Sequence, residues 1–157
     1  MLSARLIRMI EDHAEQLTRA LLTDMQSNPR TPSYHKLASH EVHDRVYNVY
    51  RHLGQWLGNT VDDSVEAAYT KLGARRRAEG YPLSELMWAL ILTKYHLRDY
   101  INASGLVDSA VDLYQEQELH RLVGQFFDKA MYFTTKGYEG ESARSTSAAA
   151  EPARSRA

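Results

Sequence analysis

The sequence predicts an all-α fold: a single helical bundle of about five main helices. Apolar residues recur at steps of three and four in five segments, and no stretch shows the alternation of a β-strand. The 4 prolines and 8 glycines lie almost entirely between those segments. A chain of 157 residues with 43% hydrophobic side chains has room for one core. We therefore expect one helical domain over residues 1–140.

The first two helices are predicted from apolar stripes. One spans about residues 3–26 and ends before Pro29 and Pro32, because proline lacks an amide hydrogen and disfavours helix just before itself. The other spans about residues 39–57, with Ser39 as a suitable N-cap. The stripes are Leu6, Ile10, Ala14, Leu17, Leu21 and Met25 in the first helix, and Val42, Val46, Val49, Leu53 and Trp56 in the second.

Three more helices follow. The third spans about residues 62–79, opens on aspartates and closes on three arginines, which complements the helix dipole. The fourth spans about 82–101 and starts at its proline or at Ser84. Its first half is apolar all round, so we expect it to be the central element. The fifth spans about 109–136, with the stripe Leu119, Leu122, Phe126, Ala130 and Phe133.

The C-terminal residues 141–157 differ from the rest in composition. They are rich in alanine, serine and arginine and contain no large apolar side chain, so they cannot bury enough surface to offset the entropy of ordering. We expect a disordered tail. This division leaves no room for an output domain, so any signal is expected to pass to another chain.

Composition excludes several classes of protein. The 19 lysines and arginines nearly balance the 20 aspartates and glutamates, so we expect no nucleic-acid partner. Without cysteine there is no disulfide scaffold, zinc–thiolate site or thiol nucleophile. The longest apolar run, 86–92, is far shorter than the roughly 20 residues of a bilayer span. A cytoplasmic, bacterial-type protein without membrane contact fits these features.

Histidines supply two alternative cofactor sites. His40 and His43 share a helix face, as metal ligands on a helix do, and a third ligand such as His35 or Asp44 would complete a divalent-metal site. The simpler interpretation is a solvated helix start. His96 lies among apolar and aromatic residues, as a proximal haem ligand does, but a hydrogen-bonded imidazole at the core rim shows the same pattern. We expect no cofactor, with haem or metal as alternatives.

Aromatic and acidic residues give the remaining candidates. Core packing is the main interpretation of the aromatic residues, and a ligand cleft at Trp88, Tyr95 and His96 is the alternative. We expect the fifth helix to form a homodimer seam, and we expect Glu15, Glu41 and Glu85 on solvated faces. No glycine-rich phosphate loop or nucleophile elbow occurs, so an enzyme is not predicted. The expected seam residues are Leu119, Leu122, Phe126 and Phe133.

One segment resembles a known family. Ala74-Arg75-Arg76-Arg77-Ala78-Glu79-Gly80-Tyr81-Pro82-Leu83-Ser84-Glu85-Leu86, followed by Trp88-Ala89-Leu90, looks like the central motif of the N-terminal domains of RsbRD-type RsbT co-antagonist proteins, the sensory subunits of bacterial stressosomes. Phe126–Tyr132 and then Gly137–Glu139 resemble the last helix of that family. The similarity covers about residues 3–140 and transfers no functional residue.

The resemblance implies an all-helical sensory domain, related to globin-like dimeric domains that lost haem. Such a domain usually precedes a STAS output domain or a kinase. Together with the composition, it predicts a non-enzymatic signal-input or protein-interaction domain. We expect a homodimer that acts on a separate signalling protein of STAS or kinase type. A haem or metal sensor that uses His96 or the His40/His43 pair is the alternative.

Overall fold

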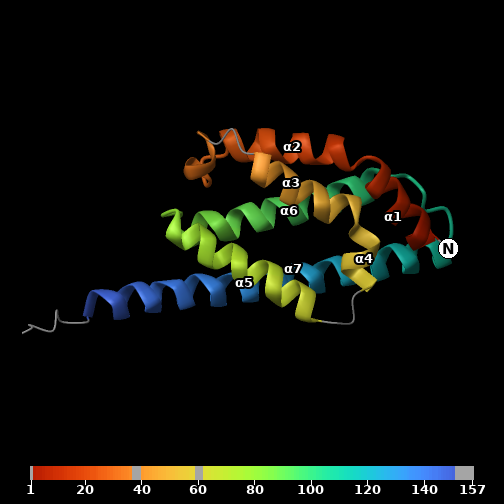
Figure 1. Cartoon of the computed structure of the whole chain (residues 1–157). Helices are drawn as coiled ribbons and strands as arrows, with labels where there is room; N and C mark the ends of the chain where they lie inside the picture. Colours follow the sequence, from red (N-terminus) through yellow and green to blue (C-terminus); the bar gives the residue numbers. More distant parts are fainter. Residues whose placement is uncertain (1, 37–39, 59–61, 151–157) are drawn as a thin grey trace, which may run out of the picture.

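The structure, a computed structural model, describes residues 2–36, 40–58 and 62–150. Within these ranges all regular structure is helical (Figure 1), as predicted. Seven α-helices are present there instead of about five main ones. In chain order the elements are α1 (Leu2–Asp12), α2 (Ala14–Ser27), the 3-10 turn η1 (Pro32–Tyr34), α3 (His40–Arg51), α4 (Leu53–Gly58), α5 (Asp62–Ala78), α6 (Leu83–Ala103) and α7 (Ala110–Ala150).

Two expected helices are each divided by a bend at a histidine. At His13 a ring nitrogen, Nδ1, lies 2.7 Å from the Met9 carbonyl oxygen, so the side chain enters the helical hydrogen-bond ladder. At His52 the bend directs α4 toward α1, where a Cβ on Gly54 would lie 3.3 Å from the Ile7 side chain. The apolar stripes continue through both bends, which is why the sequence predicted unbroken helices.

The predicted helix ends are less accurate than the helices themselves. The fifth predicted helix was expected to end near 136, but α7 continues through residues 141–150. Alanine favours helix, and a helix that is already formed extends without a nucleation cost. Residues 141–150 therefore differ from the expected disordered tail. The predicted N-cap Ser39 and the tail residues 151–157 lie outside the described residues.

The fourth predicted helix, now α6, lies in the middle of the fold. It packs against α2 on one side and α7 on the other, and α3 lies beside α2 (Figure 1). The hydroxyl of the fully buried Tyr50 on α3 donates a hydrogen bond to the Thr93 carbonyl oxygen on α6 at 2.8 Å. Every residue of the first predicted stripe is buried, and so are the first four of the second. Among the helices of the described part of the chain, none combines the length and apolar character of a membrane span.

Two glycines bring the α5 and α7 backbones into direct contact. These helices form the most extensive helix pairing within the described ranges. A Cβ added to Gly73 would overlap the Thr134 carbonyl oxygen, and one added to Gly137 would overlap the Thr70 carbonyl oxygen. No side chain other than hydrogen fits at either position, so the two helices meet backbone to backbone.

A tight corner joins α5 to α6. Gly80 ends α5 with φ at +84°, a left-handed conformation that favours glycine, and the Tyr81 amide donates to the Arg76 carbonyl oxygen at 2.9 Å. The Tyr81 ring stacks on Tyr34 with a centroid separation of 5.0 Å. Tyr138 of α7 donates its hydroxyl hydrogen to the Tyr81 carbonyl oxygen at 2.7 Å. This corner fixes α5, α6 and α7 relative to one another.

A buried carboxylate also holds the corner in place. Glu85, expected on a solvated face, is buried and accepts hydrogen bonds from the Ser33 amide (2.8 Å) and hydroxyl. The carboxylate therefore ties the first turn of α6 to η1. The expectation for Glu85 was wrong because its partner lies far away in the sequence.

Candidate functional site

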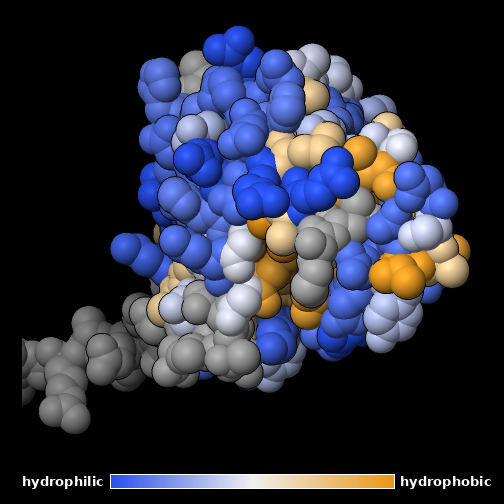
Figure 2. All heavy atoms as spheres, turned by 90° about the vertical axis from the view of Figure 1, so that its right-hand side faces the viewer, coloured by the Kyte–Doolittle hydropathy of each residue, from blue (hydrophilic) through white to orange (hydrophobic). Residues whose placement is uncertain are grey.

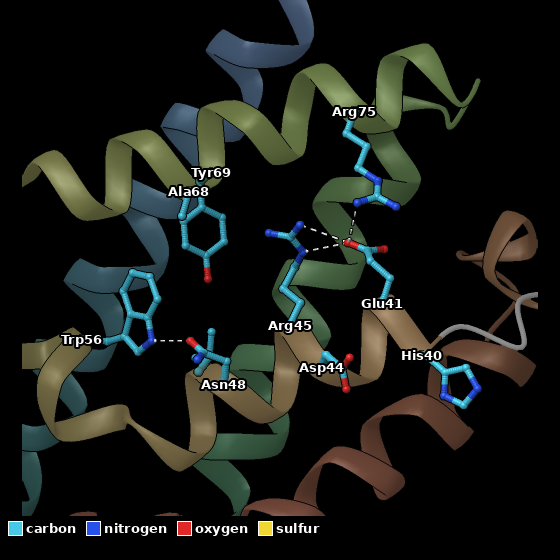
Figure 3. Close-up of a pocket in the computed structure, with 10 residues that line it drawn as sticks. His40, Glu41, Asp44, Arg45, Asn48, Trp56, Ala68, Tyr69 and Arg75 are labelled. Atoms are coloured by element: carbon cyan, nitrogen blue, oxygen red, sulfur yellow. Dashed lines mark hydrogen bonds and ion pairs between the residues drawn. The ribbon is translucent and has the colours of Figure 1, made fainter.

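A pocket of about 600 Å³ lies between α3, α4 and α5 (Figure 3). Its size falls within the range of about 300–1,000 Å³ that is usual for small-molecule sites. One side is apolar and aromatic, and the other carries charged groups. The lining residues are His40, Glu41, Asp44, Arg45, Asn48 and Val49 from α3, Trp56 from α4, and Ala68, Tyr69 and Arg75 from α5.

Trp56 and Tyr69 form the aromatic end of the pocket. The Trp56 indole N–H donates to the Asn48 side-chain oxygen at 3.2 Å, which fixes the ring against the end of α3. Trp56 meets Tyr69 edge-on at 6.3 Å between centroids, and Phe126 of α7 lies behind both rings. These contacts give the pocket a rigid aromatic wall.

The Tyr69 hydroxyl points into the pocket (Figure 3). The residue is only 4% exposed, and its hydroxyl has no hydrogen-bond partner among the described residues. Burial raises the pKa of Tyr69 far above its usual value, so the phenol stays neutral. Because this hydroxyl faces the pocket and no described protein group accepts its hydrogen, it is a donor available to a bound molecule.

The charged end is built around Glu41. Arg45, one turn later on α3, holds the Glu41 carboxylate at 3.0 Å, and Arg76 of α5 holds it at 2.6 Å. Arg75 lies 3.8 Å from the same carboxylate and 2.8 Å from Glu79. Arg76 also reaches Glu79 at 3.0 Å. Three guanidinium groups thus face two carboxylates, so the cluster carries one positive charge in excess.

Arg76 connects this cluster to the α5–α6 corner. Only 3% exposed, it lies with its guanidinium 5.4 Å from the centre of the Tyr81 ring. Burial of Glu41 opposes ionisation, but the hydrogen bonds and positive charges of Arg76 and Arg45 hold the pKa of that carboxyl below its usual value. The pair therefore stays ionised at neutral pH and links α3 to the end of α5.

The three consecutive arginines 75–77 make three different sets of contacts. Arg75 lines the pocket, Arg76 is buried, and Arg77 donates a long hydrogen bond (3.4 Å) to the Tyr138 hydroxyl and lies over its ring. The run closes α5, as the sequence predicted, but Arg76 also forms the link between helices that the sequence interpretation missed.

A smaller hollow of about 230 Å³ adjoins the pocket. It shares Asn48 and Trp56 with the larger pocket and adds His52, Gln55 and Ser64. The two hollows therefore adjoin at Asn48 and Trp56.

The residues predicted to form a cleft lie elsewhere, on α6. Trp88 packs its ring under the Arg30 guanidinium at 4.3 Å and meets Tyr95 edge-on at 6.3 Å. His96 donates from Nε2 to the Asp24 carboxylate at 2.8 Å, and this hydrogen bond, the largest cause, lowers the pKa of Asp24. None of the three lines the pocket. A cleft at these residues stays a prediction.

The haem alternative at His96 stays a prediction, and it would require the ring to leave its present hydrogen bond. The nitrogen that would ligate iron is the one that binds the Asp24 carboxylate. The imidazole at the rim of the core, the simpler interpretation, agrees with this geometry.

The two histidines of α3, His40 and His43, lie in different surroundings. His40 lines the edge of the pocket, whereas His43 lies 3.0 Å from Glu15 and 3.2 Å from Asp44. The Asp44 hydrogen bond, with support from Glu15, raises the pKa of His43 although burial opposes this shift. Within residues whose side chains are described, no group of three histidine, aspartate or glutamate side chains is arranged to hold a metal ion.

The expected seam residues on α7 differ in exposure. Leu119 and Phe126 are buried in the core of their own chain, and Leu122 and Phe133 are half-buried. Figure 2 shows the end of the molecule near the start of α7, where hydrophobic residues gather in the centre and on the right of the face. The exposed large apolar residues of α7 are Val111, Leu113, Tyr114 and Tyr132.

Comparison with known proteins identifies a family. The family model described as the RsbT co-antagonist protein rsbRD N-terminal domain matches residues 11–152. No curated protein and no solved structure matches the chain.

Proposed function

Because the chain belongs to the family of RsbT co-antagonist protein rsbRD N-terminal domains, we propose that it is a non-enzymatic signal-input domain. It acts in the cytoplasm on an output protein of STAS or kinase type, within a stressosome-type complex. The family match over residues 11–152 carries this proposal, and the resemblance of the Gly80–Glu85 corner supports it.

The proposed mechanism uses the link between α3 and α5. The Glu41–Arg76 pair joins the α2–α3–α6 part of the fold to the α5–α7 pair. A ligand or partner that binds one arrangement of these two parts more tightly shifts the population toward it. The pocket between α3 and α5 lies beside this link, so an occupant is well placed to bias it. No resident cofactor is part of the proposal.

The homodimer belongs to the same proposal, with its seam on the outer face of α7. Tyr114 and Tyr132 are 69% and 60% exposed. They lie 18 residues apart, which is five turns at about 3.6 residues per turn, so both point to the same side of the helix. Exposed tyrosines are frequent in interfaces. Leu122 and Phe133 flank this face, whereas Leu119 and Phe126 support it from inside.

We predict that light scattering gives twice the chain mass at high micromolar concentration. The double variant Tyr114→Glu/Tyr132→Glu should be a folded monomer, because neither side chain belongs to the core. Tyr95→Glu, at an exposed tyrosine of α6, is the matched control and should stay dimeric. A monomeric wild-type chain would contradict the dimer.

The signalling role predicts a specific complex. We expect the purified chain to bind an RsbT-type kinase or a STAS-type antagonist from the same genome, measured by surface plasmon resonance with an unrelated kinase as control. Absence of binding to both candidate partners, with a correctly folded chain, would refute the proposed role.

A further inference from the structure

We propose that the pocket between α3, α4 and α5 binds a small organic acid with a flat apolar body. The carboxylate of the acid lies between Arg45 and the Tyr69 hydroxyl, and its body packs on Trp56 and Ala68. This ligand proposal gives the chemical class of the signal. Its biological meaning rests on the proposed signal-input role.

The apolar body is inferred from the shape and chemistry of the wall. Trp56, Val49 and Ala68 line one side of a pocket of about 600 Å³. Trp56 is held by Asn48 and by the rings of Tyr69 and Phe126, so its indole is fixed before anything binds. A rigid aromatic surface of this kind favours a flat group that stacks on it.

The acidic group is inferred from unpaired donors. Arg45 uses Nε and one terminal nitrogen on Glu41, and its remaining terminal nitrogen points toward Tyr69 (Figure 3). That nitrogen and the Tyr69 hydroxyl have no partner in the described part of the chain. Both are donors directed into one space, which is the arrangement that a carboxylate requires.

The charge balance agrees with an anion. Arg45, Arg75 and Arg76 face only Glu41 and Glu79, so a single carboxylate would neutralise the cluster. A cation would add to the excess. Asp44, the other acidic group of the lining, has a side chain 80% exposed to solvent and near His43, so it competes weakly for Arg45.

A purely structural role does not account for Tyr69. Its ring packs on Trp56 and Phe126, and phenylalanine would make the same ring contacts without a hydroxyl directed into the pocket. Tyr69→Phe is therefore expected to leave the unbound chain as stable as wild type or more stable, while binding of the acid weakens. This opposite effect on stability and binding separates a ligand contact from a packing contact.

The test is calorimetric titration of the full chain with benzoate, phenylacetate and 3-phenylpropionate, each compared with its uncharged amide. We expect at least one acid to bind about tenfold or more tightly than its amide, because a hydrogen bond to a charged group contributes more than a neutral one. Inorganic phosphate, which lacks the flat body, should bind more weakly than that acid.

Variants locate the binding. Tyr69→Phe and Arg45→Gln should each weaken binding of that acid about tenfold, and Arg45→Gln leaves Glu41 paired with Arg76. Tyr95→Phe makes the same chemical change on α6, outside the pocket, and should bind like wild type. The inference is wrong if all three acids fail to bind at millimolar concentration, if each amide or phosphate binds as well as the acid, or if Tyr95→Phe rather than Tyr69→Phe weakens binding.

The outcome is independent of the proposed signalling role. Binding of the acids is measured on this chain alone, whereas the signalling role is tested by its complex with a kinase or a STAS protein. If the acids do not bind but the complex with the kinase or the STAS protein forms, the inferred ligand site is wrong and the signalling role stands.

Discussion

Gly137→Ala is expected to lower the free energy of unfolding by about 3–5 kcal/mol, or to prevent folding altogether. The added methyl group would overlap the Thr70 carbonyl oxygen of α5, a backbone atom that no rotamer change can move away. The two helices must separate, and the most extensive helix pairing of the described residues then loosens. Gly73→Ala should have the same effect, because its methyl group would overlap the Thr134 carbonyl oxygen of α7. Denaturation followed by circular dichroism measures both.

Gly124→Ala is the matched control because it makes the same change in the same helix. A Cβ at Gly124 would meet no atom within 4 Å. Alanine favours helix over glycine, so this variant should gain up to about 1 kcal/mol. If Gly124→Ala and Gly137→Ala changed the stability equally, the direct backbone contact between α5 and α7 would be refuted.

Arg76→Met is expected to cost about 3 kcal/mol of folding free energy. The change removes a buried charge that joins α5 to α3 and leaves Glu41 with Arg45 as its close partner. The double variant Glu41→Gln/Arg76→Met removes both charges of the pair and should cost less than the sum of the two single changes. Purely additive costs would contradict an ionic link.

The pH dependence tests the same link. Burial of Glu41 opposes ionisation, but Arg76 and Arg45 lower its pKa in the folded state from the usual 4.5. The stability that this pair contributes is therefore fully present above about pH 4.5 and is lost as the pH falls through the lowered pKa. The difference in unfolding free energy between wild type and Arg76→Met should shrink over that acidic range. A difference that stayed constant would rule out ionised Glu41 as the partner.

Local periodicity predicted most of the core correctly. The stripe from Leu6 to Met25 is buried although α1 and α2 are separate helices, because the bend at His13 keeps both stripes on one side. The bends themselves escaped prediction. They depend on a histidine ring at one site and on the approach of α4 to α1 at the other, and neither contact is encoded by spacing.

The pocket escaped prediction because its residues come from three helices that the sequence cannot place side by side. Two buried charged residues outside the pocket lining, Arg76 beside the pocket and Glu85 at the α5–α6 corner, did leave a signal. The buried positions Val65, Tyr69 and Leu72 of α5 continue at helical spacing to Arg76, and Glu85 lies four residues before the buried Ala89. A charged residue on an apolar stripe requires a buried partner. This signal indicates that a partner exists but does not identify it as Glu41 or Ser33.

The contact between Gly73 and Gly137 has a mechanical consequence. Two helices that touch through their backbones have no layer of side chains between them at that point. We therefore expect them to rotate together as one rigid body about the contact. The pocket residues Tyr69 and Arg75 lie on α5 on either side of this contact, and α7 extends beyond the other helices (Figure 1). Displacement grows with distance from the pivot, so a rotation too small to open the core becomes largest at the C-terminal end of α7.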